Sequence, residues 1–273
     1  MLGKLLKHEF KQTARYVSLI YISAAVTTLV MFIAMLTKAT AISVIGSSVL
    51  AFAGFLSVVF TVVLVIGNFY NTLYTNRGYL SFTLPVKCSS LLISKVLVSL
   101  VWFVISFVVC GLIYFVIYLN VKSQVDGEQM GGVVDAIRES GLLEMLPSGK
   151  MIAKAVIIIV FYIFISILTF VSFVYFSLSL SNTRPLQQHP WLFGFLIFCG
   201  SYIVTNTISA WLNEHLPLCI ALTEDNLKIA FSQAQNIDAL YSIGLGGMVF
   251  MTLAAVGMLF ATGWIMEHKV NIK

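Results

Sequence analysis

Few residues of this chain are arranged as catalytic or ligand-binding groups are arranged in enzymes. Ser148-Gly149-Lys150 resembles the end of a phosphate-binding loop, but Glu144 stands where that motif has a glycine and Met151 replaces its Ser or Thr. The four histidines form no HExxH pattern, and the four cysteines lack the spacing of metal ligands. We therefore predict that the chain is not an enzyme and holds no cofactor or metal ion of its own.

Three glycines, Gly244, Gly246 and Gly247, open the last hydrophobic stretch of the chain. A dinucleotide-binding motif needs a strand before its glycines, and we expect none here. Close packing of helices or a flexible entry into the stretch is the better interpretation.

A second polar group, Thr205-Asn206-Thr207, lies in the middle of a hydrophobic stretch. An amide in hydrocarbon needs a hydrogen-bond partner. That partner is a neighbouring helix, the residue's own chain or a water-filled path. The residues thus predict either contacts between helices of one chain or a site at a dimer seam or substrate path.

The segment Arg77-Gly-Tyr-Leu-Ser-Phe-Thr-Leu-Pro carries the clearest docking chemistry. Arg77 offers a fixed fork for carboxylates or carbonyls, and Pro85 fixes the chain at the end of the segment. Too many apolar side chains stand between them for a freely solvated loop: Tyr79, Leu80, Phe82 and Leu84. They predict anchors for a partner protein, the alternative being that they rest on the headgroup layer of a membrane.

The composition assigns the chain to a membrane. Of its 273 residues 59% are hydrophobic and only 10% are charged, with a mean hydropathy of +0.98, whereas soluble domains carry about 25% charged residues. Six stretches are long enough to cross a bilayer, and their cores lack Asp, Glu, Lys and Arg, which disfavours a secondary transporter. They lie near residues 17–37, 44–68, 91–119, 151–180, 191–212 and 241–266. The predicted fold class is an all-α integral membrane protein with six transmembrane helices.

The Lys and Arg residues predict that both termini are cytosolic. With that orientation ten of the sixteen lie inside, and of the acidic residues only Glu9 and Glu267 do. The inner ten are Lys4, Lys7, Lys11, Arg15, Arg77, Lys87, Lys95, Arg184, Lys269 and Lys273. This positive face suits anionic membrane lipid, and without a basic stripe carrying interleaved aromatic residues we predict no nucleic-acid partner.

Residues 1–16 form a charged leader before the first span. Its apolar residues Leu2, Leu5, Leu6 and Phe10 fall on one helical face, and its four cations fall on the others. This pattern predicts an interfacial amphipathic helix that lies along the cytosolic headgroups, the alternative being a shapeless positive anchor.

We predict one transmembrane domain over residues 1–273. Its parts outside the spans are the leader, a cytosolic loop at 69–90 and two extracellular segments at 120–150 and 213–239. The second extracellular segment mixes apolar and acidic residues at helical spacing, which predicts a short amphipathic surface helix.

Several of these features together resemble a known family. They are the basic leader Leu6-Lys7-His8-Glu9-Phe10-Lys11, two spans, the inner loop Gly-Tyr-Leu-Ser-Phe-Thr-Leu-Pro, and four further spans. The order of these features, over nearly the whole chain, resembles that in the permease subunits of ABC-2 type transporters. The resemblance is strongest to the small bacterial six-span exporter permeases. The expanded outer segment at 120–150 departs from the most compact members.

The resemblance implies an exporter permease in the bacterial plasma membrane. The apolar, aromatic-rich spans suit an amphipathic peptide, drug or lipid as its cargo better than a highly charged solute. The partners would be a separate ATP-binding subunit, which carries ATP and Mg, and a second permease, identical or a sister chain. Arg77, Tyr79, Leu80, Phe82, Leu84 and Pro85 would then couple ATP hydrolysis to transport, and Thr205, Asn206 and Thr207 would lie at the permease interface or path. The alternative function is a non-transporting sensor or immunity protein of the membrane.

Overall fold

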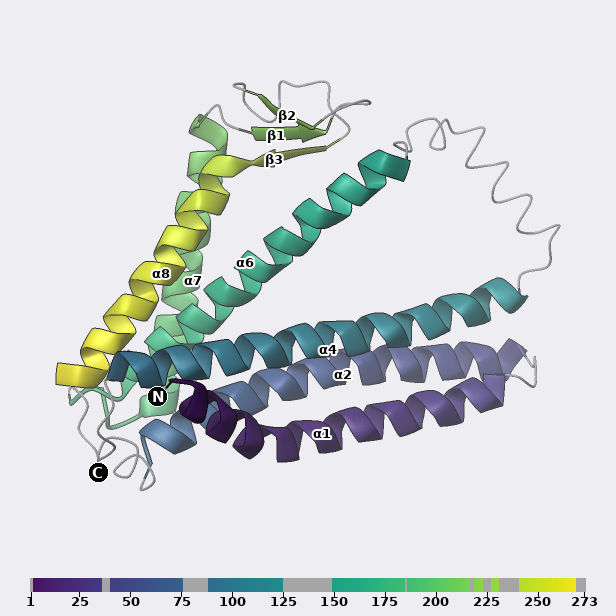
Figure 1. The fold of residues 1–273 in the computed structure, drawn as a ribbon, viewed down its shortest axis with the longest axis horizontal. Coiled ribbons are helices and arrows are strands. Elements are labelled where there is room, and N and C mark those ends of the chain that lie inside the picture. The colour runs from purple at the N-terminus through teal and green to yellow at the C-terminus, as the bar shows by residue number, and fades with distance from the viewer. Residues whose placement is uncertain are drawn as a thin grey trace. The chain divides into compact units, whose positions relative to one another are not determined.

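The computed structural model describes residues 2–35, 40–75, 88–124, 149–184, 186–216, 219–222, 227–230 and 241–268. Long helices make up nearly all of this (Figure 1). They are α1 (Leu2–Met35), α2 (Thr40–Leu73), α4 (Cys88–Gln124), α6 (Gly149–Ser181), α7 (Pro190–His215) and α8 (Leu245–His268). All six are long and apolar enough to cross a membrane, which confirms the six predicted spans.

Four of the helices are longer than a bilayer requires. α1, α2, α4 and α6 contain 34, 34, 37 and 33 residues, and at a rise of about 1.5 Å per residue each is about 50 Å long. The hydrocarbon core is only about 30 Å thick. These helices must therefore tilt or continue beyond the core, and the cations exposed on the first turns of α1 fit an end that reaches water.

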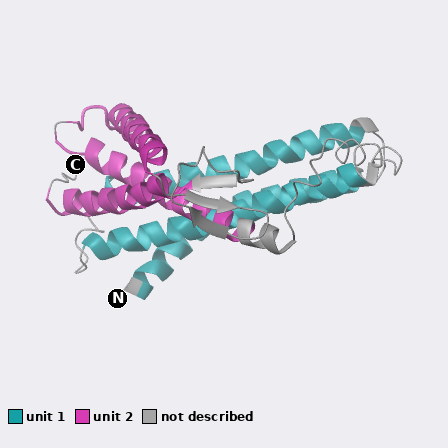
Figure 2. Cartoon of the chain, turned by 90° about the horizontal axis from the view of Figure 1, so that it is seen from above, with its two compact units in different colours: residues 1–135, 272–273 teal, residues 136–271 magenta. Residues whose placement is uncertain are grey.

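The helices fall into two compact units, residues 1–135 with 272–273 and residues 136–271 (Figure 2). The first unit holds α1, α2 and α4, each packed against the other two. Two apolar clusters stabilise it. One is centred on Val17, Val98 and Trp102, and the other, farther along the helices, is centred on Ala24, Leu50 and Ile113.

The second unit holds α6, α7 and α8, again in mutual contact. Aromatic side chains join α6 to α7. The ring centroids of Phe170 and Phe198 are 5.8 Å apart, and those of Phe173 and Tyr202 are 6.3 Å apart, both pairs edge to face. Edge-to-face pairs of this kind stabilise helix contacts in addition to the area they bury.

A small antiparallel sheet belongs to the second unit, at the end where α8 begins (Figure 1). Its strands are β1 (Cys219–Leu222), β2 (Leu227–Ala230) and β3 (Tyr241–Gly244), in the order β2-β1-β3. Cys219 pairs with Ala230 on one side and with Gly244 on the other. This corrects three predictions. Strands replace the amphipathic helix expected within 213–239, the last span begins at Leu245 and not at Tyr241, and a strand precedes Gly246 and Gly247 where none was expected.

The leader is not a separate element. α1 runs without interruption from Leu2 through the first span to Met35, so the leader forms its first turns. The limits of the other segments also change. α2 continues to Leu73 and α4 starts at Cys88, which shortens the cytosolic loop predicted at 69–90. α4 extends to Gln124 and α6 begins at Gly149, both within the extracellular segment predicted at 120–150.

Candidate functional site

The predicted coupling residues lie outside the described part of the chain. Arg77, Tyr79, Leu80, Phe82, Leu84 and Pro85 all fall in residues 76–87. The two helix ends that border this segment are described, and a polar cluster joins them.

The cluster centres on Lys95, in the second turn of α4. Its ammonium Nζ lies 2.7 Å from Oε1 of Glu9 on α1 and donates a 2.6 Å hydrogen bond to Oγ1 of Thr72 on α2. Lys95 is only 2% exposed and Glu9 only 7%. Three helices thus meet at one buried charge pair, which we call the Glu9–Lys95 cluster.

Further polar contacts continue from the cluster into the unit. The amide of Asn68 donates to Oε2 of Glu9 at 3.4 Å. One turn of α1 further on, the indole N–H of Trp102 donates to the Thr13 hydroxyl at 2.8 Å, and the Phe10 ring stacks on the Trp102 ring at 4.7 Å between centroids. Because a buried N–H or charge is costly without a partner, these contacts fix the position of α1 on α2 and α4.

The apolar residues of the leader take part in this contact. Leu6 packs against the Val17–Val98–Trp102 cluster, and Phe10 stacks on Trp102 although it stays 40% exposed. Leu5 is half-buried, while the side chain of Leu2 lies outside the described set. The cations Lys4, Lys7, Lys11 and Arg15 are all exposed. One face of the leader is thus taken up by helix contacts and the other carries its charge.

Sequence reasoning missed the Glu9–Lys95 cluster. It counted both residues among the flanking segments, where charges are normally solvated. One signal was available: Glu9 is the only acid in a leader with four cations. A lone acid among cations is a reason to look for a buried partner, but the sequence does not say which of the distant cations that partner is.

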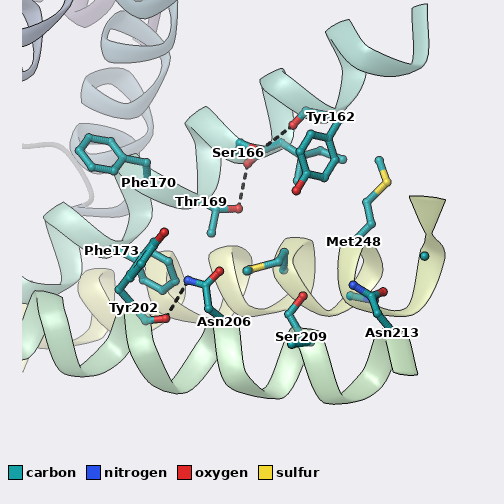
Figure 3. Close-up of a pocket in the computed structure, with 15 residues that line it drawn as sticks. Tyr162, Ser166, Thr169, Phe170, Phe173, Tyr202, Asn206, Ser209, Asn213 and Met248 are labelled. Carbon is teal, nitrogen blue, oxygen red and sulfur yellow. Dashed lines mark hydrogen bonds between the residues drawn. The ribbon is translucent and has the colours of Figure 1, made fainter. Parts of the chain in front are cut away.

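The second unit contains a cavity of about 610 Å³ lined by α6, α7 and the start of α8 (Figure 3). None of its fifteen lining residues carries a formal charge at neutral pH. Asn206, Ser209 and Asn213 point from α7 toward the space between α7 and α6, and Ser166 and Thr169 lie across from them on α6 (Figure 3). Phe170, Phe173 and Met251 supply apolar lining.

The three polar residues predicted in the fifth span have different positions. Asn206 lines the cavity, and its amide donates to the carbonyl of Tyr202 at 2.9 Å. Thr205 is buried and its hydroxyl donates to the carbonyl of Ser201. Thr207 is exposed and its hydroxyl donates to the carbonyl of Ile203. All three thus have partners in their own helix, and only Asn206 also faces the cavity.

The glycines at the start of α8 allow it to approach α7 closely. The backbone N–H of Gly247 donates to Oδ1 of Asn213 at 2.7 Å. A Cβ at Gly247 would collide with the Ser209 and Asn213 side chains, and one at Gly246 would lie 3.2 Å from the Leu212 carbonyl oxygen. The packing role predicted for Gly246 and Gly247 therefore has a direct structural basis. Gly257 has no such neighbour within 4 Å in the described structure.

No family model, curated protein or solved structure matches this chain.

The chemistry of the two sites therefore has to be judged from their side chains. Within the described residues no group of three or more His, Cys, Asp or Glu side chains could hold a metal ion. In the Glu9–Lys95 cluster, Thr72 and Lys95 lie on α2 and α4, the two helices that border residues 76–87, and Glu9 joins α1 to them. The cavity offers hydroxyls and amides beside aromatic rings, a lining that suits reversible binding of an uncharged molecule.

Proposed function

We propose that the chain is the permease subunit of an ATP-driven ABC-2 type exporter in the bacterial plasma membrane. The observation that carries the proposal is the segment Arg77-Gly-Tyr-Leu-Ser-Phe-Thr-Leu-Pro between the second and third of six spans. A permease needs a protrusion there that docks on a separate ATPase and transmits its closure. Tyr79, Phe82 and Leu84 are the proposed anchors, and Arg77 is the proposed edge contact.

The Glu9–Lys95 cluster supports this assignment physically. A docking segment transmits force only if its ends are held rigidly, and residues 76–87 follow α2 closely and precede α4 directly. Thr72 and Lys95, near those two ends, are hydrogen-bonded to each other at 2.6 Å, and Lys95 is paired with Glu9 of α1. A push on the segment would therefore move α1, α2 and α4 together.

The leader completes the proposed arrangement. Its exposed lysines and arginine would lie on the cytosolic headgroup layer, where each cation near an anionic surface contributes about 1 kcal/mol. Both termini would be cytosolic. Two such permeases, identical or sister chains, would enclose the path of an amphipathic cargo, and ATP and Mg would be bound by the ATPase partner.

The proposal is tested by co-purification. The gene is first inspected for a neighbour that encodes a Walker-motif ATPase, which the proposal predicts. The two proteins are then expressed together, solubilised in mild detergent and captured by an affinity tag on the chain. We expect the ATPase to be retained, and the double variant Phe82→Ala/Leu84→Ala to lose most of it, because truncating a buried interface anchor costs about 2 kcal/mol or more. The permease itself should reach the membrane in normal amount.

A matched control comes from α7. Phe195 and Leu196 are 67% and 55% exposed on a membrane-spanning helix, so Phe195→Ala/Leu196→Ala removes the same two side chains from a lipid-facing site and should leave ATPase binding unchanged. If the ATPase is retained equally by both double variants, the segment is a headgroup-facing turn and not a coupling element. Capture of a different membrane protein with no ATPase would favour the sensor or immunity function.

A further inference from the structure

The cavity of the second unit contains an unusual hydroxyl. Ser201, Thr205 and Thr207 on α7 each donate a hydrogen bond to a carbonyl three or four residues earlier, as hydroxyls inside helices commonly do. Ser209 does not. Its side chain has no hydrogen-bond partner among the described residues, although the residue is only 8% exposed and lines the cavity. A buried hydroxyl without a partner loses about 1–3 kcal/mol, so a ligand group that accepts a hydrogen bond from Ser209, or donates one to it, would be favoured here.

Polar groups line the cavity from its sheet end to its middle, where Ser166 and Thr169 of α6 lie across from α7 (Figure 3). Asn213 and Ser209 lie near the sheet, beside Gly244 and Gly247, and Asn206 lies one turn of α7 further in. Phe170, Phe173 and Tyr202 line the opposite end. The end away from the sheet is thus lined by aromatic rings, whereas the sheet end combines the Asn213 amide and the Ser209 hydroxyl with Tyr162 and Met248. A ligand that fits it has a polar head with hydrogen-bonding groups and an apolar remainder.

The absence of charge on the lining limits the head group further. A charged head in this site would be removed from water without an opposite charge among the fifteen lining residues, which is strongly unfavourable. An uncharged head that both donates and accepts hydrogen bonds has no such cost. The volume of about 610 Å³ lies within the usual range for sites that hold one small molecule.

We propose that the α6–α7–α8 cavity is a binding site for one uncharged amphipathic molecule, such as a single-chain glyceride. Its hydroxyl head would bond to Ser209 and to the free amide oxygen of Asn206, and its chain would lie toward Phe170 and Phe173. The site belongs to one three-helix unit, whereas the proposed transport function has a cargo passing between two permeases. It does not depend on that function, because binding is measured on the chain without an ATPase.

The test uses a monoacylglycerol with a photoactivatable diazirine in its acyl chain. The probe is added to the purified full chain in detergent, irradiated, and the modified residues are located by mass spectrometry. We expect labels concentrated on the cavity faces of α6 and α7 and competed by unlabelled monoacylglycerol. An alkyl sulfate with the same photoactivatable chain carries a permanent charge and should label these faces far less.

Ser209→Ala is the decisive variant, with Ser201→Ala on the same helix as its control because the Ser201 hydroxyl already donates to the Phe198 carbonyl. In Ser209→Ala the loss of one hydrogen bond should reduce labelling of the cavity by the probe about three- to tenfold. In Ser201→Ala the labelling should not change. Asn206→Leu, which fills the polar end, should reduce it at least as much. Each variant must elute from size exclusion like the unaltered chain. Equal labelling of all variants, or labels spread evenly over lipid-facing residues, would overturn the proposal and identify the cavity as a packing gap filled by bulk detergent or lipid.

Discussion

The carboxylate of Glu9 lies 2.7 Å from the ammonium of Lys95, 86 positions later in the chain. Both groups are almost fully buried, and Lys95 also donates to Thr72. A buried ion pair adds little net stability compared with an apolar pair, but removing one of its two charges strongly destabilises the protein. The pair therefore acts mainly as a specific fixing point: it sets how α1 lies on α2 and α4 at the helix ends next to residues 76–87.

The first prediction concerns this pair. Lys95→Met leaves the Glu9 carboxylate buried without its counter-charge, which should destabilise the protein by about 3–5 kcal/mol. The double variant Glu9→Gln/Lys95→Met removes both charges, and the new Gln amide oxygen can still accept the hydrogen bond from Asn68. It should therefore recover most of the lost stability. The measurement is the thermal unfolding midpoint of the detergent-purified protein, followed by tryptophan fluorescence.

Lys122→Met is the control for the first prediction. Lys122 lies on the same helix, α4, and is exposed, so its replacement should leave the midpoint nearly unchanged. If Lys95→Met unfolds at the same temperature as Lys122→Met, the pair does not hold the helices together and the rigid-end argument for residues 76–87 is lost.

The second prediction concerns the contact between α7 and α8. Gly247→Ala places a methyl group against the Ser209 and Asn213 side chains and disturbs the bond from the Gly247 N–H to Asn213. Overpacking of this kind costs about 1–3 kcal/mol. Gly257→Ala on the same helix meets nothing within 4 Å among the described residues, so its better helix propensity should make it neutral or slightly stabilising. If Gly247→Ala and Gly257→Ala have the same thermal unfolding midpoint, Gly247 has no special packing role.

The six spans could be predicted because the bilayer imposes a length and a composition that a sequence displays directly. The contacts between them could not. Glu9 and Lys95 carry no mutual signal, since nothing local records which of the cations is buried against Glu9. The same holds for the cavity: the sequence drew attention to Asn206, but Ser209 looks like any other span serine until its missing partner is seen.

The sheet shows a different limit. Apolar and acidic residues within 213–239 were spaced as on an amphipathic helix, and this favoured a helix there. The strand β1, Cys-Ile-Ala-Leu, is apolar throughout and so shows no alternation, and β2, Leu-Lys-Ile-Ala, contains a single polar residue. β1 is held between β2 and β3, and β3 begins 22 residues after Cys219, at Tyr241. Such pairing is a property of the folded chain.

The third prediction concerns orientation. In a background with all four native cysteines replaced by serine, Lys273→Cys should be protected from a membrane-impermeant maleimide in whole cells, because the positive-inside distribution predicts a cytosolic C-terminus. Lys122→Cys, at the opposite end of α4 from the segment 76–87, should be labelled. Labelling at Lys273 and protection at Lys122 would invert the topology and remove the segment from reach of a cytosolic ATPase.

The fourth prediction compares two neighbours on α7. Asn206 is half-buried and lines the cavity, whereas Thr207 is exposed on the outer surface of the unit, where a spanning helix meets lipid. In the cysteine-free background, Asn206→Cys should react several-fold faster with a small water-soluble methanethiosulfonate than Thr207→Cys, because only a hydrated thiol ionises to the reactive thiolate. Elution of each variant from size exclusion like the unaltered chain shows that it is folded, and labelling of both thiols after denaturation shows that both are present. Equally slow reaction at both positions would mean that water does not enter the cavity, and the polar face formed by Asn206, Ser209 and Asn213 would then serve contacts between helices alone.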